Sequence, residues 1–269
     1  MKFEYNGKSA EDFGIIVLKL DDVNMGLSRE IIKGGKTKFR ARSNHYGTKY
    51  TDDITFSIVI MKNPCNVTNQ NDLYFTSSDV RKINAWLTSP QYPAKLIIED
   101  EYYDEEIEYH ALINDLTVET GGNLHELVYS VETDSPYGLS PKYSVTTVST
   151  SSASSSITID NKSDELETCM YPVITVEPTA HGEITITNTT DNNRSMTFTA
   201  LRNNTITIDS QRRIFVDYVG GLLSFEDIGI TDVSQIKFPR LLPGKNVFTI
   251  KGNAEVTITY QEARKVGVF

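Results

Sequence analysis

The sequence predicts a mainly β protein of two domains, with one helix in the first domain. β-Branched side chains suit the pleated, half-buried surface of a strand, and the chain has 25 Ile, 19 Val and 29 Thr among its 269 residues. Only 10 residues are Ala, the best helix former. Several stretches also alternate with the period of two that strands require. We therefore expect a β-sandwich or barrel-like N-terminal domain and an antiparallel C-terminal β-sandwich.

Periodic apolar residues indicate six strands in the first domain. The strongest pattern is Ile54–Met61, in which four large apolar residues alternate with Thr, Ser, Val and Met. The expected strands are Phe3–Gly7, Phe13–Leu18, Ile54–Met61, Lys95–Ile98, Ile107–Ile113 and Leu127–Glu132.

One helix is expected between these strands. Val80, Ile83, Trp86 and Leu87 form a single apolar stripe at helical spacing. Ser77 or Ser78 can cap its N-terminus, and Pro90 prevents its continuation. We expect Trp86, the only tryptophan, to anchor this helix in the core.

A Ser/Thr-rich segment divides the chain. Ten of the 13 residues of Ser144–Ser156 are Ser or Thr, a composition typical of linkers and extended arms. Pro136, Gly138 and Pro141 precede it and favour turns that end the first domain. We expect an N-terminal domain over residues 1–142, a linker over 143–156 and a C-terminal domain over 157–269. A long surface loop inside one domain is the alternative.

The second domain has the pattern of strands throughout. Apolar residues recur with period two in seven stretches, which short turns rich in Asn, Gly and Pro separate. This arrangement is typical of an antiparallel sandwich, with the irregular residues 219–237 as a long loop between sheets. The expected strands lie at residues 157–159, 173–176, 184–186, 196–200, 206–208, 248–250 and 256–260.

Composition excludes several classes of protein. With 39% hydrophobic and 23% charged residues, the chain has the makeup of a folded globular protein. Its longest apolar run, Ile15–Leu18, is too short to span a bilayer, and its first residues lack the apolar core of a secretion signal, so we expect neither membrane insertion nor a cleaved leader. The net charge of −10 argues against a general nucleic-acid binder. Cys65 and Cys169 are too few for a disulfide framework.

The sequence contains no recognisable catalytic motif. It has no nucleophile elbow, P-loop or dinucleotide fingerprint. The four histidines, His45, His110, His125 and His181, lie at no spacing that suits a metal site. We therefore predict no catalytic residue, no metal ligand and no cofactor. A hydrolase whose site is assembled from scattered carboxylates is the enzymatic alternative.

Two runs of like charge stand out. Seven basic residues lie between Arg29 and Lys49, and seven acidic residues lie between Glu99 and Glu108. There are three alternatives. Both runs can be solvated loops, the basic run can be a nucleic-acid-binding arm, or the acidic run can be a calcium site. We prefer a repeated subunit contact in which the two runs face each other, because complementary patches on one chain can close a ring. The candidate ring-interface residues are Lys33, Lys36, Lys38, Arg40, Arg42, Glu101, Asp104, Glu105 and Glu106.

Several segments resemble the distal tail proteins (Dit) of long-tailed, non-contractile bacteriophages. They occur in the family's order and cover most of the chain. The resemblance implies an N-terminal domain, related to the tail-tube fold, that assembles into a hexameric ring around a channel. It also implies a C-terminal galectin-like β-sandwich. The segments are Phe3–Ile15, Ile83–Leu87, Leu96–Tyr103, Tyr109–Ile113, Leu241–Ile250 and Val256–Tyr260.

The role that this resemblance implies is structural. In that family the ring is the hub of the tail tip, which joins the tail tube to the tail-associated protein and in many phages carries receptor-binding proteins. DNA passes through the lumen. The protein would be a virion component, synthesised in the host cytoplasm, with no catalysis and no cofactor.

A carbohydrate-binding module or adhesin for the host surface is the alternative function. Galectins bind sugar with a His, Asn and Arg cluster and a stacking Trp. The second domain has no Trp, and its only histidine is His181, so sugar binding is not expected to carry over. Tyr218 and Phe225 remain as aromatic rings that could stack on a glycan.

Overall fold

The computed structural model describes residues 1–36, 38–39, 41–99, 106–117, 123–201, 204–230, 232 and 236–266. These residues form two compact units. Unit 1 contains Met1–Ser140 together with the chain from Arg264 onward, and unit 2 contains Pro141–Ala263. The long strands of both units pair antiparallel, and the predicted mainly β fold class is confirmed.

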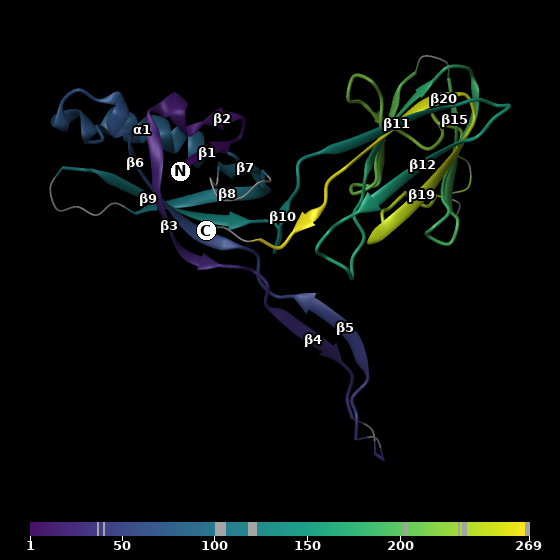
Figure 1. The fold of residues 1–269 in the computed structure, drawn as a ribbon, viewed down its shortest axis with the longest axis horizontal. Coiled ribbons are helices and arrows are strands. Elements are labelled where there is room, and N and C mark those ends of the chain that lie inside the picture. Colours follow the sequence, from purple (N-terminus) through teal and green to yellow (C-terminus); the bar gives the residue numbers. More distant parts are fainter. Residues whose placement is uncertain are drawn as a thin grey trace. The chain divides into compact units, whose positions relative to one another are not determined.

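A nine-stranded sheet is the framework of unit 1 (Figure 1). Seven strands run in the order β2-β1-β7-β8-β9-β6-β3, while β10 pairs with both β8 and β21. The strands are β1 (Lys2–Tyr5), β2 (Lys8–Ser9), β3 (Ile15–Asn24), β6 (Thr55–Lys62), β7 (Ala94–Glu99), β8 (Glu108–Thr117), β9 (Glu126–Thr133), β10 (Gly138–Leu139) and β21 (Ala263–Arg264). Three short 3-10 helices join them: η1 (Ala10–Phe13), η2 (Pro64–Asn66) and η3 (Gln70–Leu73).

The core of unit 1 forms between this sheet and helix α1 (Ser77–Leu87). The alternating residues Phe56, Ile58 and Ile60 of β6 are buried, as the period of two predicts. From α1, Ile83, Trp86 and Leu87 enter the same core. Each of the six strands expected in this half is therefore present, and Trp86 is a core residue.

The start of the helix differs from the prediction. Thr76, not Ser77 or Ser78, is the N-cap, and its hydroxyl accepts a hydrogen bond from the backbone N–H of Asp79 at 3.2 Å. The Asp79 carboxylate accepts in return from the backbone N–H of Thr76 at 2.9 Å. This reciprocal pairing requires an acidic or amide side chain three residues after the cap, and only Thr76 has Asp79 at that spacing.

Unit 2 is a sandwich of two sheets. The six-stranded sheet runs β11-β20-β13-β16-β17-β18, and the four-stranded sheet runs β12-β19-β14-β15. Alternate residues from both sheets meet in one buried cluster, which includes Phe198, Phe215 and Phe248. The strands are β11 (Tyr143–Ser149), β12 (Ser155–Asn161), β13 (Val173–Pro178), β14 (Gly182–Asn188), β15 (Arg194–Ala200), β16 (Ile206–Asp209), β17 (Ile214–Val216), β18 (Leu222–Leu223), β19 (Gly244–Lys251) and β20 (Ala254–Tyr260).

Residues 143–156 do not form the expected linker. β11 pairs with β20 over its whole length, from Tyr143↔Tyr260 to Ser149↔Ala254. On its outer side the hydroxyl of Thr146 hydrogen bonds with that of Thr257 at 2.8 Å, while Val145 packs against the buried cluster. Hydroxyl side chains are well suited to the solvated face of a sheet, so Ser and Thr here belong to a strand.

Two further boundaries differ from the expected domain limits. The chain returns to unit 1 at Arg264, so the second unit ends before residue 269. The expected long loop over residues 219–237 contributes β18 and buries Ile228 and Ile230 in the sandwich core.

Candidate assembly surface

A charged hairpin that the sequence pattern does not predict follows β3. β4 (Arg29–Lys33) and β5 (His45–Tyr50) pair only with each other, as a two-stranded sheet. Figure 1 shows this hairpin leaving the large sheet at the end of β3. The exposed side chains include Ile31 (51%) and Tyr46 (66%). Because a two-stranded hairpin is only marginally stable alone, these exposed apolar side chains favour contact with another surface.

Charged and aromatic side chains organise the hairpin. Lys49 forms an ion pair with Glu30 at 3.0 Å. The Arg29 guanidinium hydrogen bonds to the Tyr50 hydroxyl and lies 4.5 Å from the centre of that ring. Tyr137 contacts Tyr50 edge-on, with 6.4 Å between ring centres. The first two contacts join β4 to β5, and the Tyr137 contact joins the base of the hairpin to the rest of unit 1.

The structure places the described basic candidates on or beside this hairpin. Lys33 ends β4, while Lys36, Lys38 and Arg42 lie in the connection to β5, and all four are exposed. None of the four has an ion pair in the part of the chain that the structure describes. Arg40 lies outside the described residues. Residues 29–49 carry seven basic residues and one acidic residue, a net charge of +6 on a chain of −10.

Little of the acidic run can be placed. Glu101, Asp104 and Glu105 lie outside the described residues. Glu106 is described and exposed, just before β8. Among the described residues no ion pair joins the two runs, so their pairing across a subunit contact stays a prediction.

The last carboxylate of the acidic run is buried at the start of β8. The side chain of Glu108 is 7% exposed, and its two oxygens lie 2.9 Å from His110 Nε2 and 3.2 Å from Lys95 Nζ. Hydrogen bonding to His110 and then to Lys95 outweighs burial and lowers the pKa of Glu108 to about 2. The pKa of Asp134, whose carboxylate lies 3.9 Å from His110 Nδ1, is raised by burial.

This cluster makes the stability of unit 1 depend on pH. Because the folded-state pKa of Glu108 lies below its ordinary value of 4.5, its contribution is present above that value and is lost as the pH falls toward 2. With partly exposed partners we expect a loss of about 1–2 kcal/mol. Urea unfolding at a series of pH values, followed by the fluorescence of Trp86, measures it. The Glu108→Gln variant should lose this part of the pH dependence.

The exposed Glu4 provides a matched control on β1. Glu4→Gln should keep the pH dependence of the parent protein. An equal acid-induced loss of stability in Glu108→Gln and in the parent protein would contradict the assignment to Glu108.

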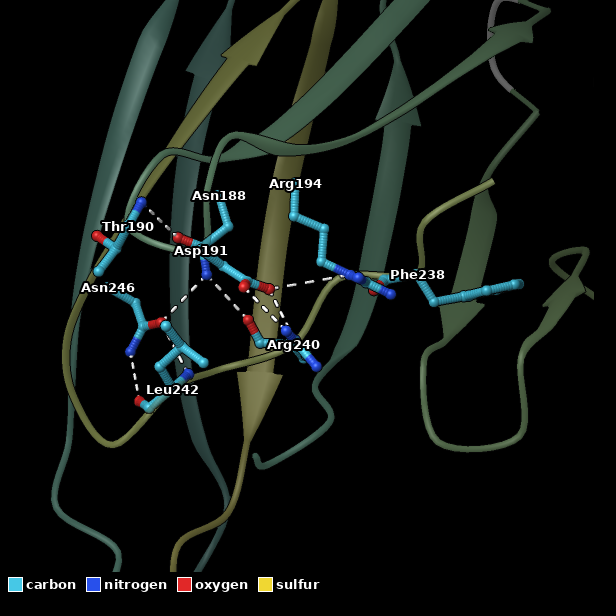
Figure 2. Close-up of polar contacts among 8 residues, drawn as sticks. All are labelled: Asn188, Thr190, Asp191, Arg194, Phe238, Arg240, Leu242 and Asn246. Carbon is cyan, nitrogen blue, oxygen red and sulfur yellow. Dashed lines mark hydrogen bonds and ion pairs between the residues drawn. The ribbon is translucent and has the colours of Figure 1, made fainter. Parts of the chain in front are cut away.

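Unit 2 contains a buried polar network that no sequence motif indicates (Figure 2). Asp191, 5% exposed, accepts hydrogen bonds from Arg240 Nε at 2.7 Å and Nη2 at 3.0 Å. This pairing with Arg240 lowers the pKa of Asp191 and raises that of Arg240. Arg194 Nε donates to the carbonyl of Phe238 at 2.7 Å. The two arginines therefore hold the chain before β19 against the β14–β15 turn.

Two buried asparagines complete the network. Asn188 Nδ2 donates to the Arg240 carbonyl at 2.9 Å and to Asn246 Oδ1 at 3.1 Å. Asn246 in turn accepts from the backbone N–H of Leu242 and donates to its carbonyl. Figure 2 shows these side chains converging on one loop. These side chains hydrogen bond to the backbone of Phe238, Arg240 and Leu242, so the network clamps residues 238–246.

The described residues form neither a metal-binding cluster nor a membrane-spanning helix. No group of three or more His, Cys, Asp or Glu among them is placed to hold a metal ion. No described helix is long and apolar enough to cross a membrane. Of the two proposed glycan platforms, Tyr218 is 76% exposed, whereas Phe225 packs edge-on against Phe215 with 6.1 Å between ring centres.

Two family descriptions match the sequence. "Phage tail protein N-terminal domain" matches residues 1–135, and "phage tail C-terminal domain" matches residues 137–260. No curated protein has a significantly similar sequence.

Solved structures with a similar fold come from phage tails. The Dit protein of phage SPP1, described as a paradigm of the hub adsorption apparatus in phages infecting Gram-positive bacteria, has a TM-score of 0.65 at 15% identity over 98% of both chains. A chain of the activated phage P2 baseplate with Ca has a TM-score of 0.55 at 7% identity over 98% of both chains. A chain of the activated baseplate with Sr has a TM-score of 0.52 at 9% sequence identity over 96% of both chains. The likeness establishes a Dit-like fold.

Proposed function

The chain belongs to the phage tail protein family in both of its halves, and from this premise we propose that it is the structural hub of a siphophage tail tip. Six copies form a ring through unit 1, between the tail tube protein and the tail-associated protein. The protein is a non-catalytic component of the virion. Unit 2 docks a further virion protein, such as a receptor-binding protein, or covers the ring.

The observation that carries this proposal is the agreement between family and fold over the whole chain. Both halves match phage tail families, and the SPP1 hub protein shares the fold over 98% of the chain. The hairpin adds an exposed surface with apolar side chains and a charge opposite to that of the rest of the protein. An acidic protein also suits a channel through which DNA must pass without being held.

The ring contact proposed here pairs the hairpin of one copy with the acidic run of its neighbour. Such a contact is heterologous, so a fixed rotation between copies closes a ring. Complementary charge sets the register and orientation of the copies, and added salt should weaken the contact.

Charge reversal tests this contact. We expect Lys36→Glu/Lys38→Glu/Arg40→Glu to shift assembly to at least about tenfold higher protein concentration at physiological salt. Sedimentation and negative-stain images measure the mass and show the rings. Lys142→Glu/Lys245→Glu/Lys251→Glu, on exposed positions of unit 2, is the matched control.

A charge swap makes the test specific. Mixing the reversed hairpin variant with Glu101→Lys/Asp104→Lys/Glu105→Lys should restore part of the assembly, because each mixed contact can again pair opposite charges. Unchanged rings in the hairpin variant would refute this interface. A monomer that binds glycans would instead favour the adhesin alternative.

A further inference from the structure

We propose that the C-terminal strap, Ala263–Lys265, positions the charged hairpin by holding its base through Tyr50. The inference is independent of the ring contact, because every contact it uses lies within one copy of the chain. The hairpin needs such a support, since β4 and β5 form a two-stranded sheet of their own, and a sheet of that size is only marginally stable. Tyr50, at the end of β5, is the one residue of the two strands that is not exposed.

The ring of Tyr50 gathers three side chains. The Arg29 guanidinium lies 4.5 Å from the centre of the ring, and Lys265 Nζ lies 5.8 Å from it. Both distances are within the range of about 6 Å over which a tyrosine ring attracts a cation. Tyr137 meets the ring edge-on, with 6.4 Å between ring centres. Arg29 belongs to the hairpin itself, so Tyr137 and Lys265 are the two groups that connect its base to the body of unit 1.

The strap reaches the hairpin from a backbone that is already held. Ala263 is fully buried, its N–H donates to Ser163 Oγ at 3.0 Å, and its carbonyl accepts from the backbone N–H of Asp164 at 3.0 Å. β21 then pairs with β10. Tyr137 directly precedes β10 and Lys265 directly follows β21, so one strand pair brings both side chains to the same ring. The contact therefore orders little more than the lysine side chain.

Holding the base directs the exposed part of the hairpin. Ile31, Tyr46 and the basic residues beyond β4 all project from it into solvent. A hairpin that could swing freely would lose that freedom on docking, and the loss would weaken binding. The strap removes part of the freedom beforehand, so the hairpin is pre-organised for whichever surface it meets.

Hydrogen–deuterium exchange of the whole chain tests the strap. Lys265→Met removes the ammonium group and keeps a side chain of similar length, and we expect the backbone amides of β4 and β5 to exchange about threefold faster. Lys265→Arg, which keeps a cation, should exchange at the parent rate. Lys251→Met, at an exposed lysine of unit 2, is the matched control and should leave the hairpin unchanged.

A double-mutant cycle assigns the effect to the ring. Tyr50→Leu should itself speed the exchange of the hairpin. Adding Lys265→Met to Tyr50→Leu should cause no further change, because the cation then has no ring to contact.

Four results would overturn the proposal. They are unchanged hairpin exchange in Lys265→Met, equally fast exchange in Lys265→Arg and Lys265→Met, and an equal effect of Lys265→Met with and without the Tyr50 ring. The fourth is a uniform acceleration across unit 1, which would mean that Lys265 stabilises the whole unit and does not position the hairpin.

Discussion

Replacing Trp86 with alanine is expected to lower the free energy of unfolding of unit 1 by about 4 kcal/mol. The indole is 5% exposed, and it stacks on Phe13 and lies nearly parallel to Phe3 with 5.4 Å between ring centres. Its N–H also donates to the Tyr5 carbonyl. The substitution therefore removes the contact between α1, η1 and β1, leaves a cavity and leaves a buried carbonyl without its donor.

Urea unfolding followed by circular dichroism measures this loss, because the variant has no tryptophan to report. Trp86→Phe is the matched control: it keeps a stacked ring but loses the N–H donor, and we expect it to cost about half as much. If the alanine variant does not fold, the phenylalanine variant still provides a measurable value. An alanine variant within about 1 kcal/mol of the parent protein would show that the helix does not depend on this anchor.

The strands and the helix could be predicted because each buries one face. The alternation from Ile54 to Ile60 and the stripe from Val80 to Leu87 are direct consequences of a face that contacts the core. The predicted linker over residues 143–156 is wrong because the outer residues of β11 are Ser and Thr, and composition alone does not separate a linker from a solvated strand. The cross-strand partner Thr257 is 111 residues away from Thr146, so no local pattern reveals the pairing.

The candidate assembly surface could be predicted only in part. Its positive charge is visible in the sequence, and the described lysines are exposed as a charge run requires. Its hairpin form is not visible, because β4 has no buried face and therefore no apolar period.

The polar network of unit 2 is the clearest example of a feature that local sequence patterns do not reveal. Asp191 and Arg240 are 49 residues apart, and the residues around Asp191 indicate only a turn. Folding places the carboxylate at the end of the sandwich, where the arginine closes over it. No spacing in the sequence indicates this pair. Its loss is nevertheless expected to cause the second large fall in the free energy of unfolding predicted for this protein.

Arg240→Met is expected to lower the free energy of unfolding of unit 2 by about 3 kcal/mol. The variant leaves the buried carboxylate of Asp191 without its two charge-assisted hydrogen bonds, and the Nε of Arg194 lies 3.9 Å away. Asp191→Leu/Arg240→Met should recover most of the loss, because it removes the unpaired charge as well. Differential scanning calorimetry of the three proteins measures these changes.

Arg212→Met is the control for this pair, because Arg212 is 76% exposed and lies 3.8 Å from Asp209. It should cost less than about 0.5 kcal/mol. The pH dependence gives an independent test. Since pairing with Arg240 holds the pKa of Asp191 below its ordinary 3.8, the parent protein should lose this stabilisation as the pH falls below about 4, and Arg240→Met should lose less. Equal costs for Arg240→Met and Arg212→Met, or a double variant less stable than Arg240→Met, would mean that the clamp on residues 238–246 does not depend on this ion pair.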